Sequence, residues 1–199
     1  MKDEKYLNEL IDEYTRLKAE YVYSDLMKED EYFVSYMATK KTSFLGYKHG
    51  YYELFIQQKN GIEETDKIRK NCKNYLKLFK NYKGDLVQVQ NIKNGKIDCV
   101  HQVHRINDTI YLFPFSSDGG FYPTYGYVTK YSDNHVTEEY MVHGNQIIYE
   151  RYEEVNGGEE YYFINYVRNG KYPVLEERKG VFTFDPLGYK ELESDYWMN

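Results

Sequence analysis

Short turn signals divide residues 86–187 at near-regular intervals. They are Asn94-Gly95, Asn107-Asp108, Asp133-Asn134, Gly144-Asn145, Asn156-Gly157-Gly158 and Asn169-Gly170. Asn, Asp and Gly tolerate the positive φ angles that two-residue hairpin turns require. The segments between the turns are rich in β-branched and aromatic residues, which favour strands. This part of the chain therefore predicts an antiparallel β-meander, either an open sheet or a partial barrel.

The spacing of these turns predicts the individual strands of the meander. They are expected at residues 86–92, 97–105, 109–115, 121–131, 135–142, 146–155, 159–168 and 172–178, and residues 181–184 would close the set. Residues 116–120 (Ser-Ser-Asp-Gly-Gly) form the longest irregular gap. Residues 161–167 are apolar or aromatic on both sides, which favours a central strand. Residues 188–199 are not assigned to a strand.

The first 84 residues are expected to contribute two amphipathic helices and short strands. Residues 2 to about 23 carry Leu7, Leu10, Ile11, Tyr14 and Leu17 at helical spacing. This helix is expected to cover one face of the sheet, with homodimerisation through the same stripe as the alternative. Residues 32–37 read as a strand, and residues 44–56 as two short aromatic strands joined near Gly46 and Gly50.

A second helix is expected over residues 63–82. Its apolar side would be Ile68, Cys72, Tyr75, Leu76 and Phe79, and the lysines between them follow without an acidic residue. A basic amphipathic helix can bind a membrane surface, a phosphate backbone or an acidic partner. The sequence thus predicts an α+β fold, with two helices packed on a curved meander of about eight or more strands. Residues 1–84 and 85–199 would form two parts of one compact domain.

Composition places the chain among ordinary globular proteins, with 41% hydrophobic and 29% charged residues and a net charge of −6. The first 83 residues hold 16 basic and 14 acidic side chains, and the remainder hold 10 and 18. Such a mildly acidic chain is not expected to bind nucleic acid generally. No apolar run is long enough to span a membrane, and two cysteines do not make a disulfide framework. We therefore expect a cytoplasmic protein.

Few residue patterns suggest chemistry. Cys99 and His101 share one side of a strand, and His135 or His143 from a neighbouring strand would complete a zinc-type set, but no zinc motif is present. Ser116 or Ser117 with His104 and Asp118 would be a hydrolase alternative centred on residues 99–120, without a nucleophile-elbow motif. Adjacent glutamates such as 138–139 and 153–154 place one member of each pair toward the interior. No metal and no cofactor is expected, and catalysis is less expected than binding.

The 25 tyrosines are the remaining candidate for a functional surface, because tyrosine is enriched at protein interfaces. Codon bias of a low-GC genome is the competing explanation. The candidate binding residues are Tyr122, Tyr125, Tyr127, Tyr140, Tyr149, Tyr161, Tyr162, Tyr166, Asp118, Lys70, Lys73 and Lys77. The leading hypothesis is a non-catalytic inhibitor, immunity or accessory protein that binds another protein through a tyrosine-rich acidic sheet surface. The alternatives are a small-molecule-binding barrel-like protein, the hydrolase, and nucleic-acid binding through residues 67–83.

Overall fold

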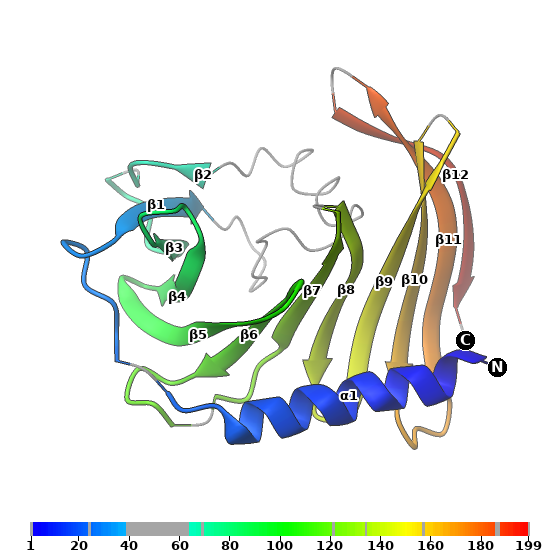
Figure 1. The fold of residues 1–199 in the computed structure, drawn as a ribbon, viewed down its shortest axis with the longest axis horizontal. Coiled ribbons are helices and arrows are strands. Elements are labelled where there is room, and N and C mark those ends of the chain that lie inside the picture. Colours follow the sequence, from blue (N-terminus) through cyan, green and yellow to red (C-terminus); the bar gives the residue numbers. More distant parts are fainter. Residues whose placement is uncertain are drawn as a thin grey trace.

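The described residues fold as one long helix on a strongly curved antiparallel sheet (Figure 1). The computed structural model describes residues 2–23, 25–38, 64–68, 70–120, 122–133, 135–156, 158–185 and 188–198. The described elements are α1 (Lys2–Glu20), β1 (Phe33–Ala38), β2 (Glu64–Thr65), β3 (Tyr75–Lys80), β4 (Leu86–Lys93), β5 (Lys96–Ile106), β6 (Thr109–Phe115), β7 (Gly126–Ser132), β8 (His135–His143), β9 (Gln146–Val155), β10 (Gly158–Val167), β11 (Val174–Asp185) and β12 (Gly188–Met198).

From β3 to β12 every strand pairs with the next strand along the chain, so the predicted meander is confirmed. The turn residues Asn94, Asn107, Asp133 and Asn169 adopt φ angles of 54°, 51°, 49° and 59°. These are the left-handed angles that a tight hairpin requires and that Asn and Asp tolerate. The described strands form an open sheet whose outer members are β12 and β2.

Strand boundaries differ from the predictions in three places. β7 begins at Gly126 rather than at residue 121, because residues 122–125 form an irregular connection. The strands expected at 172–178 and 181–184 are one strand, β11. The unassigned tail is β12, paired with β11 from Asp185↔Gly188 to Glu176↔Met198. The two aromatic strands expected within residues 44–56 lie outside the described residues.

The helix expected over residues 63–82 is wrong. The described part of this segment contains the short strand β2, a turn and the strand β3. Leu76 and Leu78 alternate with Lys77, and β3 pairs with both β1 and β4. The apolar and basic residues of this segment fit a helical period as well as an alternating one. Hydrogen-bonded pairing with a strand on each side stabilises the extended conformation instead of the helix. The basic helical face on which the nucleic-acid hypothesis rested is therefore not formed.

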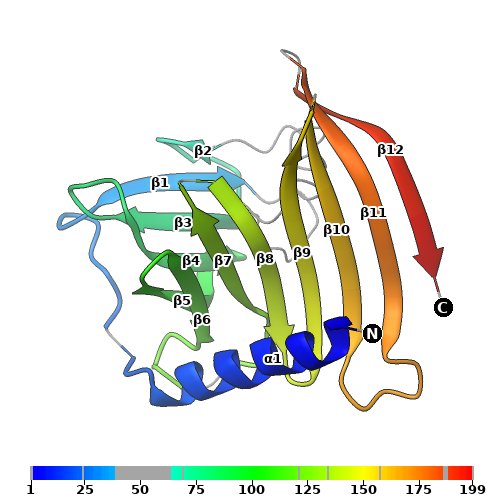
Figure 2. The same cartoon turned by 45° about the vertical axis from the view of Figure 1, so that its right-hand side comes forward.

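The helix α1 packs against the outside of the curved sheet, across β6–β10 (Figures 1 and 2). Its predicted apolar stripe is confirmed: Leu7, Leu10, Ile11 and Tyr14 are all buried. They meet side chains from neighbouring strands, namely Tyr111, Phe113, Phe115, Val128, Tyr140, Val142, Ile147, Tyr149, Ile164 and Tyr166. The stripe is thus covered within the chain. Dimerisation through this helix stays a prediction.

Tyr14 of α1 lies directly against the backbone of the sheet. Its hydroxyl donates to the carbonyl oxygen of Leu112 at 3.4 Å and lies directly above Gly126 of β7. A Cβ atom at Gly126 would lie 1.5 Å from that hydroxyl oxygen. Glycine is therefore required here for space, so that the helix can approach the sheet.

Polar contacts hold residues 6–12 of α1 against the sheet. The hydroxyl of Tyr6 donates to both carboxylate oxygens of Glu138, at 2.9 and 2.7 Å, and Lys130 lies 3.0 Å from the same carboxylate. Arg168 bonds the Asp12 carboxylate at 2.7 Å and the Asn8 carbonyl oxygen at 2.8 Å. These partly buried contacts define the position of the helix along the sheet.

The other face of the sheet is concave, because β1, β3 and β4 curl over it (Figure 1). Met37, Leu76 and Leu78 from this curled end pack with Leu112, Tyr127 and Met141 from β6–β8. Residues far apart in the strand order meet only because the sheet bends. The concave face is thus the place where the two parts of the chain enclose space.

Candidate functional site

A pocket of about 360 Å³ opens on the concave face, between the β3–β4 turn and the ends of β5–β7. Ten residues line it: Gly84, Asp85, Leu86, Arg105, Asn107, Asp108, Ile110, Leu112, Thr129 and Tyr131. The volume lies within the range of about 300–1,000 Å³ that is typical of small-ligand sites. The curl of the sheet builds this pocket, because Leu86 and Leu112 belong to the same concave apolar cluster.

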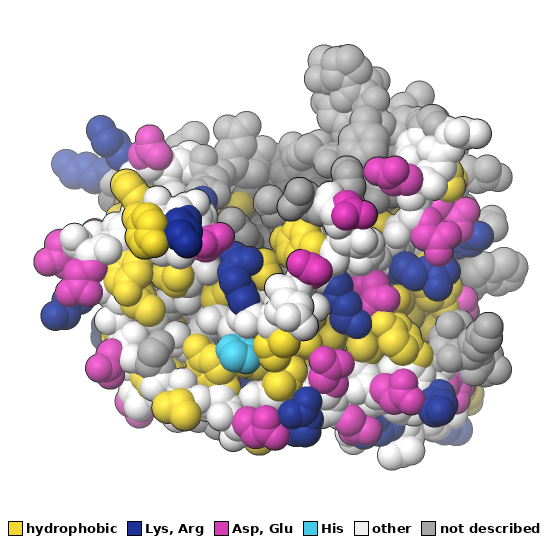
Figure 3. Space-filling view, in the orientation of Figure 1, with side chains coloured by type: hydrophobic (Ala, Val, Ile, Leu, Met, Phe, Trp, Pro, Cys, Tyr) yellow, Lys and Arg dark blue, Asp and Glu magenta, His cyan; other side chains and the backbone are white. Residues whose placement is uncertain are grey.

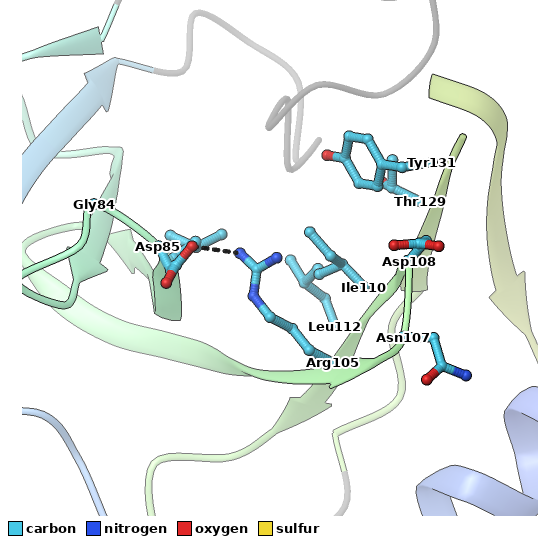
Figure 4. Close-up of a pocket in the computed structure, with 10 residues that line it drawn as sticks. Gly84, Asp85, Arg105, Asn107, Asp108, Ile110, Leu112, Thr129 and Tyr131 are labelled. Atoms are coloured by element: carbon cyan, nitrogen blue, oxygen red, sulfur yellow. Dashed lines mark ion pairs between the residues drawn. The ribbon is translucent and has the colours of Figure 1, made fainter. Parts of the chain in front are cut away.

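The pocket combines an apolar floor with a polar rim (Figure 4). Leu86 and Leu112 are buried, Ile110 is half-buried, and the Tyr131 ring stands at one wall. Arg105 extends its guanidinium group into the space between Asp85 and Ile110, whereas the Asn107 amide points away. An apolar surface with a few convergent polar groups is the usual composition of a ligand site.

Arg105 is the cation of this site. Its guanidinium lies 3.8 Å from the Asp85 carboxylate, and the two side chains are 44% and 46% exposed. A separation of 3.8 Å is too long for a hydrogen bond. Among the described residues, Arg105 therefore keeps its hydrogen-bond donors available to a ligand or to water.

A row of polar side chains continues from the pocket along the concave face. Thr129 donates to a carboxylate oxygen of Glu139 at 3.2 Å. Glu139 stands directly opposite Glu150 across β8 and β9, and the Tyr152 hydroxyl donates to Glu150. The two glutamates are only 3% and 6% exposed. A catalytic carboxylate pair must reach substrate and water, so this burial favours a structural role.

The predicted tyrosines do not lie on one surface. Tyr140, Tyr149, Tyr162 and Tyr166 face α1, whereas Tyr125, Tyr127 and Tyr161 face the concave side. Five of them are at most 4% exposed: Tyr127, Tyr140, Tyr149, Tyr161 and Tyr166. In this structure these five build the aromatic core, because each ring contributes a large apolar area. Only Tyr122, Tyr125 and Tyr162 are half-buried at the surface.

Burial raises the pKa of the core tyrosines. Desolvation is the largest cause for Tyr14, Tyr140 and Tyr149, whose ionised forms would lose their hydration inside the core. The Tyr140 hydroxyl is buried and makes no hydrogen bond to any described residue. At the surface, desolvation and a hydrogen bond from its hydroxyl to Asp98 raise the pKa of Tyr122 to about 12. These tyrosines stay neutral at physiological pH.

The predicted lysines lie on a turn and a strand. Lys70 and Lys73 are exposed in the β2–β3 connection, and Lys77 on β3 pairs with Glu29. Figure 3 shows basic and acidic side chains interspersed over the face in view, without a patch of a single sign. A phosphate backbone needs clustered cations. On the face in view, the basic side chains are therefore not clustered as a phosphate backbone requires.

The residues of the hydrolase alternative are not brought together. The Ser116 hydroxyl donates to Asp118, and a hydrogen bond from the Gly120 amide to Asp118 at 3.2 Å closes this exposed loop. The Ser116 hydrogen bond is the main cause that lowers the Asp118 pKa. His104 instead packs against Tyr21, with ring centroids 5.3 Å apart, on the helix side of the sheet. The serine hydroxyl thus has a carboxylate partner, and the histidine that would activate it lies in an aromatic cluster.

Cys99 and His101 do share a face, as their spacing predicts. The Cys99 sulfur lies 3.6 Å from His101 Nδ1, and His101 Nε2 lies 3.3 Å from the Tyr125 carbonyl oxygen. Burial is the main cause that raises the Cys99 pKa to about 12, so the thiol stays protonated. In the part of the chain that the structure describes, no group of three metal-ligating side chains is formed.

The sequence interpretation missed the pocket residues Arg105, Ile110, Thr129 and Tyr131. Strand alternation was one signal that could have found Arg105. This residue continues the series Cys99, His101 and Val103, so its side chain is expected on the same face of the sheet. A charged residue at such an inward position often marks a site. The second wall, from the β3–β4 turn, was hidden because residues 63–82 were expected to be helical.

Comparisons with family models, with curated proteins and with solved structures find no match for this chain. Of the helices in the described residues, none is long and apolar enough to cross a membrane.

Proposed function

We propose that this is a non-catalytic binding protein and that the pocket on its concave face holds a small molecule. The observation that carries the proposal is the pocket itself, with an apolar floor beneath an arginine whose donors are available. Six of the ten lining residues belong to strands β4–β7, including Arg105, and the other four lie in the β3–β4 and β5–β6 turns. Paired strands hold side chains more precisely than loops do, so the apolar surface and the arginine are well positioned. The residues considered for catalysis are separated, buried or bonded elsewhere, which favours binding over turnover.

A ligand screen by nuclear magnetic resonance tests this proposal. A filtrate of cellular metabolites below about 1 kDa, added to ¹⁵N-labelled protein, should shift the amide signals of Arg105, Ile110 and Thr129, because these residues surround the pocket. The variant Ile110→Trp should abolish the shifts by filling the space. Thr109→Trp is the matched control, since alternation turns Thr109 to the opposite face of β6. Shifts confined to other regions, or no shift at all, would contradict the proposal.

A protein partner is the second candidate, and one observation favours it. Phe33 and Tyr82 are 66% and 82% exposed. Phe33 stands opposite Lys80 at the end of β3, and Tyr82 belongs to the β3–β4 turn that also carries the pocket residues Gly84 and Asp85. Exposed aromatic residues beside a pocket are frequent anchors in protein interfaces.

Site-specific cross-linking tests this second candidate. A photoreactive phenylalanine at position 82 should give one saturable adduct in cell extract, and excess unlabelled protein should compete for it. Phe33→Ala in the same chain should reduce the adduct at least fivefold, because it removes a neighbouring anchor. The same probe at Tyr172, which is 61% exposed on the β10–β11 connection, is the control. Equal labelling at the two positions would count against a specific partner.

A further inference from the structure

The charges of the pocket restrict the ligand that it can hold. Arg105 is its cation, and Asp85 and Asp108 are its anions. A simple anion would meet two carboxylates, and a simple cation would meet the guanidinium. A molecule that carries one positive and one negative group can satisfy both kinds of side chain at once.

The arginine suits a carboxylate. Its planar guanidinium can donate two parallel hydrogen bonds to a carboxylate, and such charge-assisted pairs are about twice as strong as neutral hydrogen bonds. The loose 3.8 Å contact with Asp85 leaves this geometry possible. Asp85 is itself held in place, because its carboxylate accepts from the Asn81 side chain at 3.1 Å and its amide donates to Asn81 at 3.0 Å.

The aspartates suit an ammonium group. Asp85 comes from the β3–β4 turn and Asp108 from the β5–β6 turn, so they flank the pocket from two sides. Leu86, Ile110 and Leu112 form the apolar part of the lining. A volume of about 360 Å³ is near the lower limit for ligand pockets and suits a single small molecule better than a nucleotide cofactor.

We propose, on the basis of the binding function above, that the pocket recognises a free α-amino acid with an apolar side chain. Its carboxylate binds Arg105, its ammonium group binds the aspartate carboxylates at the rim, and its side chain packs on Leu86, Ile110 and Leu112. Each end of a peptide carries only one of these two charged groups, the ammonium or the carboxylate. A free amino acid carries both and therefore satisfies the site better than a chain end.

Isothermal titration of the full chain with L-leucine and L-phenylalanine tests the ligand class. At least one of them should bind, and the analogues that lack one charge, 4-methylpentanoic acid and 3-methylbutylamine, should bind at least tenfold more weakly. Arg105→Gln and Asp108→Asn should each weaken amino-acid binding at least tenfold. Arg151→Gln, at a side chain that is 48% exposed and paired with Glu153, is the matched control and should leave affinity unchanged.

The outcomes separate the two proposals. Pocket shifts with the metabolite filtrate but no binding of either amino acid would overturn the ligand class and leave the binding function standing. Equal affinity for L-leucine and one of its singly charged analogues would do the same. Failure of both the filtrate and the amino acids would overturn both proposals.

Discussion

Replacing Gly126 by alanine should destabilise the protein by about 3 kcal/mol or more, which is the upper range for overpacking a core. The added methyl group would lie 1.5 Å from the Tyr14 hydroxyl oxygen and 2.2 Å from Cζ of the same ring. Tyr14 is 3% exposed and surrounded by core residues, so it has no open direction in which to move. Urea unfolding followed by far-ultraviolet circular dichroism measures the loss.

Two further variants make this result interpretable. Gly144→Ala adds the same methyl group to an exposed turn with open space around it, and only its φ of +58° is strained, so it should cost about 1 kcal/mol. Tyr14→Ala should itself cost about 3–5 kcal/mol, but it removes the clash. In the double variant the effects of Gly126→Ala and Tyr14→Ala should therefore be far from additive. Additive effects, or a Gly126→Ala variant as stable as Gly144→Ala, would show that the helix does not approach the sheet in this way.

Alkaline pH should unfold the protein steeply above pH 10. Tyr14, Tyr140 and Tyr149 have pKa values raised by burial, whereas unfolded tyrosine titrates near 10. Above pH 10 the unfolded chain therefore loses protons that the folded chain keeps, and the free energy of unfolding falls. Each such group contributes a slope of about 1.4 kcal/mol per pH unit, so the three together approach about 4 kcal/mol per unit. Domains of this kind are stable by about 5–15 kcal/mol.

The measurement is the free energy of unfolding in urea between pH 8 and pH 11. Stabilisation by these groups should be complete below pH 10 and decline above it. Tyr140→Phe should reduce the slope by about 1.4 kcal/mol per unit. It should not cost stability at neutral pH, since the lost hydroxyl makes no hydrogen bond to a described residue. Tyr172→Phe, at an exposed position, should keep the wild-type slope. A folded state in which all 25 tyrosines ionise near pH 10 without unfolding would contradict the burial of this core.

The sequence predicted the meander well because hairpins are local structures. Asn94, Asn107, Asp133 and Asn169 adopt positive φ angles that few other residues tolerate, so their positions mark the turns directly. The apolar stripe of α1 was equally predictable. Apolar residues that recur with the 3.6-residue period of a helix form one face, and a single apolar surface is enough to bury it. Segment 63–82 failed for the opposite reason: its residues fit both periods, and the partners β1 and β4 that selected the strand are remote or follow later in the chain.

The candidate site was only partly predictable. Tyrosine enrichment indicated large aromatic contacts, but it did not say that Tyr127, Tyr140 and Tyr161 would be buried. Alternation assigned each side chain to one face of the sheet. It did not predict which face α1 would cover and which face would become concave. Alternation could therefore predict that Arg105 is a charged residue on the inner face of the sheet, but not that it lies in a pocket.

By itself the sequence determined the order of the strands, the position of their turns and the burial of the N-terminal stripe, because these follow from interactions between residues close along the chain. The tertiary structure alone decided that the sheet bends until β1 and β3 meet β6–β8, and that Asp85, Arg105 and Asp108 surround one space. Curvature depends on the packing of side chains from strands that are remote in sequence. The meander is thus fixed by local rules, and its candidate binding site by contacts between distant residues.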